Sequence, residues 1–102
     1  MAEPALKLAT KFLRVAVENF DMGWLPAVED ELQLIGVDLT DLHNALLGCE
    51  VQRSNKIDAG GASFVVSGET TEGERMKIRV WVDPDARVIR VDEVTLVSGV
   101  GR

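Results

Sequence analysis

Apolar and polar positions alternate with a period of two through the C-terminal half of the chain. The clearest run spans residues 76–82 and sets apolar side chains against charged or aromatic ones: Met76, Ile78, Val80 and Val82 against Lys77, Arg79 and Trp81. Because successive side chains of a strand point to opposite faces of a sheet, this run predicts a strand with its apolar face on a core. Similar runs at residues 64–66 and 88–97 are separated from it by turns at 69–73 and 83–86. A short run at 49–53 adds a fourth predicted strand, and a loop is predicted after it at 54–61.

Apolar positions in the first half recur every three or four residues, which is typical of amphipathic helices. The first predicted helix spans residues 4–20, has Pro4 in its first turn, and turns seven apolar residues toward the core: Ala5, Leu8, Ala9, Phe12, Leu13, Ala16 and Phe20. Residues 21–23 break this helix. A second helix is predicted over 25–35, with Gly36 as its C-terminal cap and an apolar face of four residues: Leu25, Val28, Leu32 and Ile35. A third, short helix is predicted within 37–48, capped by Asp38 or Thr40 and ended by Gly48.

Helices followed by strands predict an α+β fold, with two or three N-terminal helices packed on one face of a four-stranded antiparallel β-meander. A chain of 102 residues suits a single domain over residues 1–102. Its helical part is expected at about 4–48 and its sheet at about 49–97, with a frayed tail at 98–102.

Composition places the chain among cytoplasmic globular proteins. No apolar run approaches the roughly 20 residues of a membrane span, and the N-terminus lacks the basic region of a signal peptide. The single cysteine, Cys49, excludes an intrachain disulfide and cysteine-cluster metal sites, and the single histidine, His43, excludes a pair of imidazole ligands. We therefore expect a cytoplasmic protein with no cofactor and no metal site.

The net charge of −6 is distributed unevenly along the sequence. Residues 18–50 contain eight acidic residues and no Lys or Arg, including the consecutive Glu29, Asp30 and Glu31 on the second predicted helix. Such a surface favours basic protein partners and disfavours nucleic acid. The alternative interpretation is that these charges are ordinary solvated helix faces.

Residues 36–51, with Gly36 ending a helix and Gly48 three residues before Val51, resemble small RelE-, BrnT- and MqsR-like toxin domains. In those domains a helix ends at Arg-Gly-Ile, a short helix follows, and Gly-x-x-Val enters the first strand. Residues 64–70, together with Gly73, Arg75 and the run 77–80, resemble the central hairpin of the same group. The resemblance covers about residues 20–97. It implies helices followed by a curved sheet and, for active members, metal-independent cleavage of RNA on the sheet face.

Active members of that group carry a histidine and basic residues on the helix that precedes the Arg-Gly-Ile. The matching positions here are Ile35, Glu31 and Ala27. None of these side chains supplies a proton to a leaving oxygen or stabilises phosphate charge, and Glu31 repels an anionic substrate. The resemblance therefore implies a member that is catalytically degraded or repurposed.

Three single residues have both a structural and a functional interpretation. We expect His43 to face solvent without a catalytic partner, because Asp41 lies on a different helix face. We expect Cys49 to be a buried structural thiol, because it follows a helix C-terminus, where the dipole raises rather than lowers a thiol pKa. We expect Trp24 to anchor the core near Phe20, with an exposed aromatic patch as the alternative.

The outward face of the predicted sheet carries the best remaining site. Lys77, Arg79 and Trp81 lie on one strand and Arg90 on the next, with Arg53 or Arg75 nearby. Cations interleaved with an aromatic ring suit a nucleic acid or an anionic protein surface. The alternative is a solvated face on which these cations pair with three neighbouring acids, Glu69, Asp92 and Glu93.

Taken together, these features predict a non-catalytic acidic interaction protein that binds a protein partner through Glu29, Asp30 and Glu31, through the Lys77/Arg79/Trp81/Arg90 face, or through both. An RNA-cleaving or RNA-binding toxin-like domain is the alternative, although the net charge disfavours nucleic acid. We further expect a capacity for homodimerisation by edge pairing, because nothing in the sequence protects the terminal strand.

Overall fold

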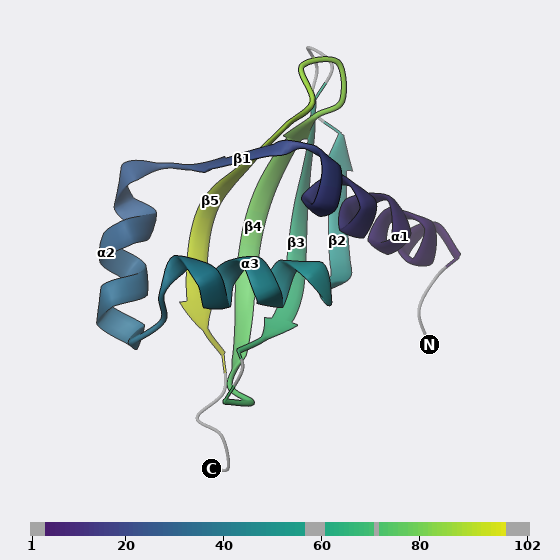
Figure 1. The fold of residues 1–102 in the computed structure, drawn as a ribbon. Helices are drawn as coiled ribbons and strands as arrows, with labels where there is room; N and C mark the ends of the chain where they lie inside the picture. The colour runs from purple at the N-terminus through teal and green to yellow at the C-terminus, as the bar shows by residue number, and fades with distance from the viewer. Residues whose placement is uncertain (1–3, 57–60, 71, 98–102) are drawn as a thin grey trace.

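A computed structural model describes residues 4–56, 61–70 and 72–97 of the chain. Within these ranges there are three helices and five strands (Figure 1). In chain order they are α1 (Pro4–Asn19), β1 (Asp21–Trp24), α2 (Pro26–Ile35), α3 (Leu39–Leu47), β2 (Glu50–Lys56), β3 (Ala62–Glu69), β4 (Arg75–Asp83) and β5 (Val88–Leu96).

The sheet has the strand order β1-β5-β4-β3-β2. The four strands β2 to β5 form an antiparallel meander, as the alternation of their side chains predicts. The prediction of four strands is nevertheless wrong, because β1 adds a fifth strand that runs parallel to β5. Residues 21–23, interpreted as a mere helix break, are held extended by β5: the Asp21 amide donates to the Arg87 carbonyl and the Leu25 amide to the Val91 carbonyl.

All three helices cover one face of this sheet, and the other face is open (Figure 1). In that view α3 crosses in front of the strands, α1 lies at the β2 edge and α2 lies beside β5. On β4 the predicted alternation is confirmed. Four side chains are completely buried under the helices, Met76, Ile78, Val80 and Val82, while Lys77 and Arg79 are exposed on the open face and Trp81 is half-buried there.

Helix α1 is rotated about its axis from the predicted orientation. Leu13, Ala16 and Val17 are its buried residues, whereas Leu8 and Phe12, both expected to face the core, are exposed. The helix has more apolar positions than one face can hold, so periodicity alone does not decide which face packs on the sheet.

The caps of α2 and α3 match the sequence-based expectation. Gly36 ends α2 with φ at 74°, in the left-handed region where glycine has no steric cost. Asp38 caps α3 by accepting a hydrogen bond from the Asp41 amide at 2.8 Å, and Gly48 ends that helix. Leu42, Ala45 and Leu46 form its buried face, as expected.

Strand β2 extends to Lys56, past its predicted end at residue 53. The loop predicted over 54–61 is therefore wrong for residues 54–56, which pair with the first residues of β3 despite their polar composition. Residues 57–60 of that segment and the tail predicted at 98–102 lie outside the described residues. No helix in the described part of the chain combines the length and the apolar character required to cross a membrane.

Candidate functional site

The open face of the sheet brings together the four side chains predicted to form a site. Lys77, Arg79 and Trp81 project from β4, and Arg90 of β5 lies directly across from Trp81. In the same register Arg79 lies opposite Glu93. The alternation in the sequence therefore predicts the composition of this face correctly.

Two of these cations are already paired with acids. Arg79 forms an ion pair with Glu93 at 3.2 Å, with both side chains about half exposed. Arg90 donates two hydrogen bonds to the Asp92 carboxylate, which raises the pKa of its guanidinium. The guanidinium also lies 4.9 Å from the centre of the Trp81 ring. Arg90 is therefore engaged by Asp92 and by the Trp81 ring within the protein itself. The interpretation of this region as a salt-bridged face is confirmed for Arg79 and Arg90.

Other cations of the open face remain available. Arg53 of β2 and Lys77 form no ion pair within the described part of the chain, whereas Arg75 pairs with Glu69 at 3.0 Å. Arg53 and Lys77 line a hollow of about 210 Å³ together with four other residues: Val65, Arg79, Glu93 and Thr95. This hollow is the most cationic feature of the open face.

The acidic residues predicted on α2 have different roles in the structure. Glu29 accepts a hydrogen bond from the Trp24 indole nitrogen at 2.8 Å, and Glu31 accepts one from the Val94 amide of β5 at 2.9 Å. The interpretation of these charges as an ordinary solvated helix face is wrong for Glu31, which is half-buried and ties α2 to the sheet. Asp30 is exposed.

An open groove of about 500 Å³ lies between α2 and the start of α3. Its apolar lining comes from Leu32, Val37 and Leu39, and its polar lining from four residues: Glu29, Gln33, Asp38 and Thr40. The groove has an apolar floor and two carboxylates on its rim, in a segment without Lys or Arg. The sequence analysis missed it, although apolar residues beside the acids Glu29 and Asp38, on either side of Gly36, were a usable signal.

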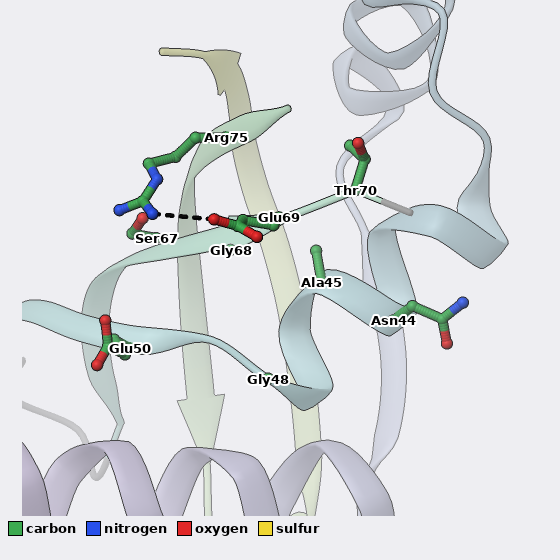
Figure 2. A pocket seen from close by; sticks show the side chains of 9 residues that line it. All are labelled: Asn44, Ala45, Gly48, Glu50, Ser67, Gly68, Glu69, Thr70 and Arg75. Carbon is green, nitrogen blue, oxygen red and sulfur yellow. Dashed lines mark hydrogen bonds and ion pairs between the residues drawn. The ribbon is translucent and has the colours of Figure 1, made fainter. Parts of the chain in front are cut away.

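A third cavity, of about 350 Å³, lies where α3 crosses the ends of β2, β3 and β4 (Figure 2). At its centre Ala45 of α3 faces Gly68 of β3, and the Asn44 side chain points away from the crossing. The Glu69–Arg75 ion pair closes one side, and the Thr70 hydroxyl accepts from the amides of Glu72 and Glu74. Its polar side chains bond to the turn after β3 and link β3 to β4. We therefore interpret this cavity as a consequence of α3 packing across the strands, with a structural role.

His43 and Cys49 are both placed by α3, on the helix-covered side of the sheet. His43 is half-buried, rather than solvent-facing as expected, and belongs to α3, whereas Lys77 and Arg79 lie on the open face of β4. Cys49 is a completely buried free thiol, as predicted, and desolvation raises its pKa to about 11 against a lowering effect of Arg14. Arg14 donates hydrogen bonds to the carbonyls of Cys49 and Gly48, and so caps the end of α3 from α1. A nearly unionised thiol is a poor nucleophile at neutral pH.

Trp24 packs partly buried against the core, as the structural interpretation predicts. No cluster of three or more His, Cys, Asp or Glu side chains suited to a metal ion occurs in the described ranges. Comparison with protein-family models, with curated proteins and with solved structures finds no significant match to the chain.

Proposed function

We propose that this protein is a non-catalytic interaction protein with a RelE-like toxin-type fold, which binds a protein partner in the groove between α2 and α3. The partner segment is basic and amphipathic: an apolar side chain fills the space over Leu32, Val37 and Leu39, and Lys or Arg side chains pair with Glu29 and Asp38. The observation that carries this proposal is the combination of an apolar floor and an acidic rim in one open groove.

Electrostatics support the choice of a basic partner. The groove belongs to a stretch of eight acidic residues without a Lys or Arg, residues 18–50. A concentrated negative surface speeds encounter with basic partners and repels competing anions. An apolar anchor inside a polar rim is the arrangement that concentrates binding energy at protein interfaces.

The toxin-like part of the proposal is supported by the arrangement of layers. Helices precede an antiparallel meander whose second face is open, which is what the resemblance implies. Two of the three positions that carry the active groups in such toxins have structural roles in this chain. Glu31 holds the Val94 amide, and Ile35 packs partly buried against the core.

A pull-down from native lysate with a matched pair of variants tests the proposal. Gln33→Lys/Thr40→Lys adds two positive charges at the groove through exposed side chains, and Asp30→Lys makes the same change in net charge on exposed α2 surface outside the groove. A protein that survives RNase, binds wild type and Asp30→Lys, and is lost with the groove variant supports the proposal. Equal loss with both variants, or retention by both, contradicts it. Thermal unfolding of each variant verifies that the fold is kept.

A second candidate, an RNA-binding or RNA-cleaving toxin-like function, is favoured by the hollow on the open sheet face. Arg53 and Lys77 are its two cations without an ion pair among the residues that the structure describes, and Glu93 beside Arg79 supplies a carboxylate. Such cations bind phosphate, but a chain of net charge −6 opposes an RNA approaching it. RNA that is recovered with wild type and lost with Arg53→Glu/Lys77→Glu would replace the leading proposal by this one.

A further inference from the structure

Helix α1 carries a second apolar face that nothing in the described structure covers. Leu8 is 70% exposed, Phe12 40% and Val15 51%. Their spacing of four and three residues places them on one side of the helix, over a length of about 10 Å. We call Leu8, Phe12 and Val15 the outer stripe of α1.

Phe12, at the centre of the outer stripe, is held in place by other aromatic rings. Its ring centre lies 6.5 Å from that of Phe20, edge to face, and 6.3 Å from that of Phe64 on β3. An anchor that is already ordered loses little conformational freedom when a partner covers it. The outer stripe is therefore a preformed apolar surface.

Charges beside the outer stripe indicate what covers it. Lys7 and Glu18 are both exposed and lie on the same flank of the stripe, near opposite ends of α1, with Phe12 almost midway between them. When two identical helices pack antiparallel about a twofold axis, equal flanks face each other. Lys7 of one copy then lies opposite Glu18 of the other, and the pair forms twice.

We propose that the outer stripe of α1 is a homodimer interface, in which the α1 helices of two copies pack antiparallel with their Phe12 side chains at the twofold axis. Leu8 of each copy packs against Val15 of the other. This inference is independent of the groove between α2 and α3, and it concerns a different surface of the protein.

The same geometry predicts one unfavourable contact. Lys11 lies on the flank that carries Lys7 and close to Phe12 in the sequence, so the two Lys11 side chains of the dimer approach each other near the axis. Like charges in such a position weaken association. Replacing Lys11 by a neutral residue is therefore predicted to strengthen the dimer, an effect that an unrelated partner would not produce.

Edge pairing, the route to a dimer suggested by the sequence, is obstructed at the terminal strand. β1 pairs with residues 88–91 of β5, and the Val94 amide of β5 donates to Glu31 of α2. At the opposite edge, the Val51 amide of β2 donates to the Thr10 hydroxyl of α1. Both sheet edges are thus partly covered, whereas the outer stripe of α1 is exposed.

Sedimentation velocity of the full chain, from about 10 µM to about 1 mM, tests the inference. Three apolar side chains a side make a small interface, so the wild type is expected to dimerise weakly, within the upper part of this range. Leu8→Glu/Val15→Glu is expected to be monomeric throughout. Leu34→Glu is the control for a surface leucine replaced by an acid, because Leu34 is 86% exposed on α2, away from the stripe, and this variant is expected to dimerise like the wild type.

Charge exchange tests the antiparallel register without touching the apolar residues. Lys7→Glu is expected to weaken the dimer about tenfold, because two attractive pairs become repulsive. Adding Glu18→Lys to the same chain restores both pairs and is expected to restore the affinity. A monomeric wild type at about 1 mM, equal effects of the stripe and Leu34 variants, or no recovery in the exchanged chain would overturn the inference.

Discussion

Gly68 is the position at which the packing of α3 on the sheet is most sensitive to a single atom. A Cβ atom at Gly68 would lie 2.6 Å from the Ala45 carbonyl oxygen and 3.1 Å from the Ala45 carbonyl carbon and Cβ. The obstacle is helix backbone, so no side-chain rotation relieves the contact. Ordinary van der Waals contact begins near 3.4 Å, and α3 must therefore retreat by about 0.8 Å.

We expect Gly68→Ala to destabilise the fold by about 2 kcal/mol, within the range measured for overpacked cores. The cost arises because a retreating α3 loosens the contacts of its buried Leu42 and Leu46. For a chain of this size, that free energy corresponds to a fall in Tm of about 10 °C. Thermal unfolding followed by circular dichroism measures it, together with urea titration to give the free energy of unfolding.

Gly48→Ala is the matched control for this prediction. A Cβ atom at Gly48 meets nothing within 4 Å, and its φ of −111° is accessible to alanine. We expect this variant to stay within about 0.5 kcal/mol of the wild type or to be slightly more stable. If Gly68→Ala unfolds at the same temperature as Gly48→Ala, α3 does not cross β3 as closely as described, and the reasoning fails.

Three further predictions concern interactions named above. Glu31→Ala leaves the Val94 amide without its acceptor and is expected to lower the free energy of unfolding by about 1–3 kcal/mol. Glu31→Gln keeps an acceptor oxygen and is expected to lower it by less. Equal losses of the two variants in urea titration would refute the role of that hydrogen bond. Because burial raises the pKa of Cys49 from 9.0 to about 11, the folded state holds the thiol proton more tightly. Its contribution to stability is present below pH 9 and is lost as the pH rises toward 11, so the wild type should lose more stability there than Cys49→Ala; parallel stability curves would contradict this. A double-mutant cycle on Arg79 and Glu93 should give a coupling free energy of only about 0.2–1 kcal/mol, because both side chains are half exposed. A much larger value would contradict the solvent-screened ion pair.

Local pattern is sufficient to predict the helices and the meander. The alternation around Ile78 and Val80 identifies the buried face of β4, and Gly36 and Asp38 identify where one helix ends and the next begins. These features depend on neighbours in the sequence, through strand periodicity and backbone capping.

What the sequence does not predict depends on distant partners. β1 is only four residues long, and its extended form relies on hydrogen bonds to a strand about 67 residues later. The half-buried position of Glu31 likewise depends on the Val94 amide of β5, which no helical periodicity indicates. Tertiary pairing of this kind overrides local propensity.

The candidate site was predicted in part for the same reason. Residue type and alternation place Lys77 and Arg79 together on the open face, but they leave open whether these cations are free or paired with acids, and the structure shows Arg79 paired with Glu93. The groove between α2 and α3 depends on the angle between two helices across Gly36, which periodicity does not contain. The face of adjacent alternating strands was predictable, and the groove between two helices was not.

The claim that the groove binds a basic protein segment is tested most directly by site-specific photo-crosslinking in whole cells. A photoreactive amino acid replaces Thr40 on the groove, Asp30 on α2 outside it, or Lys77 on the open sheet face. We predict a defined protein adduct from the Thr40 position, with no such adduct from the Asp30 or Lys77 positions. Adducts formed only from the Lys77 position, with RNA as the cross-linked species, would contradict the account and assign function to the sheet face instead.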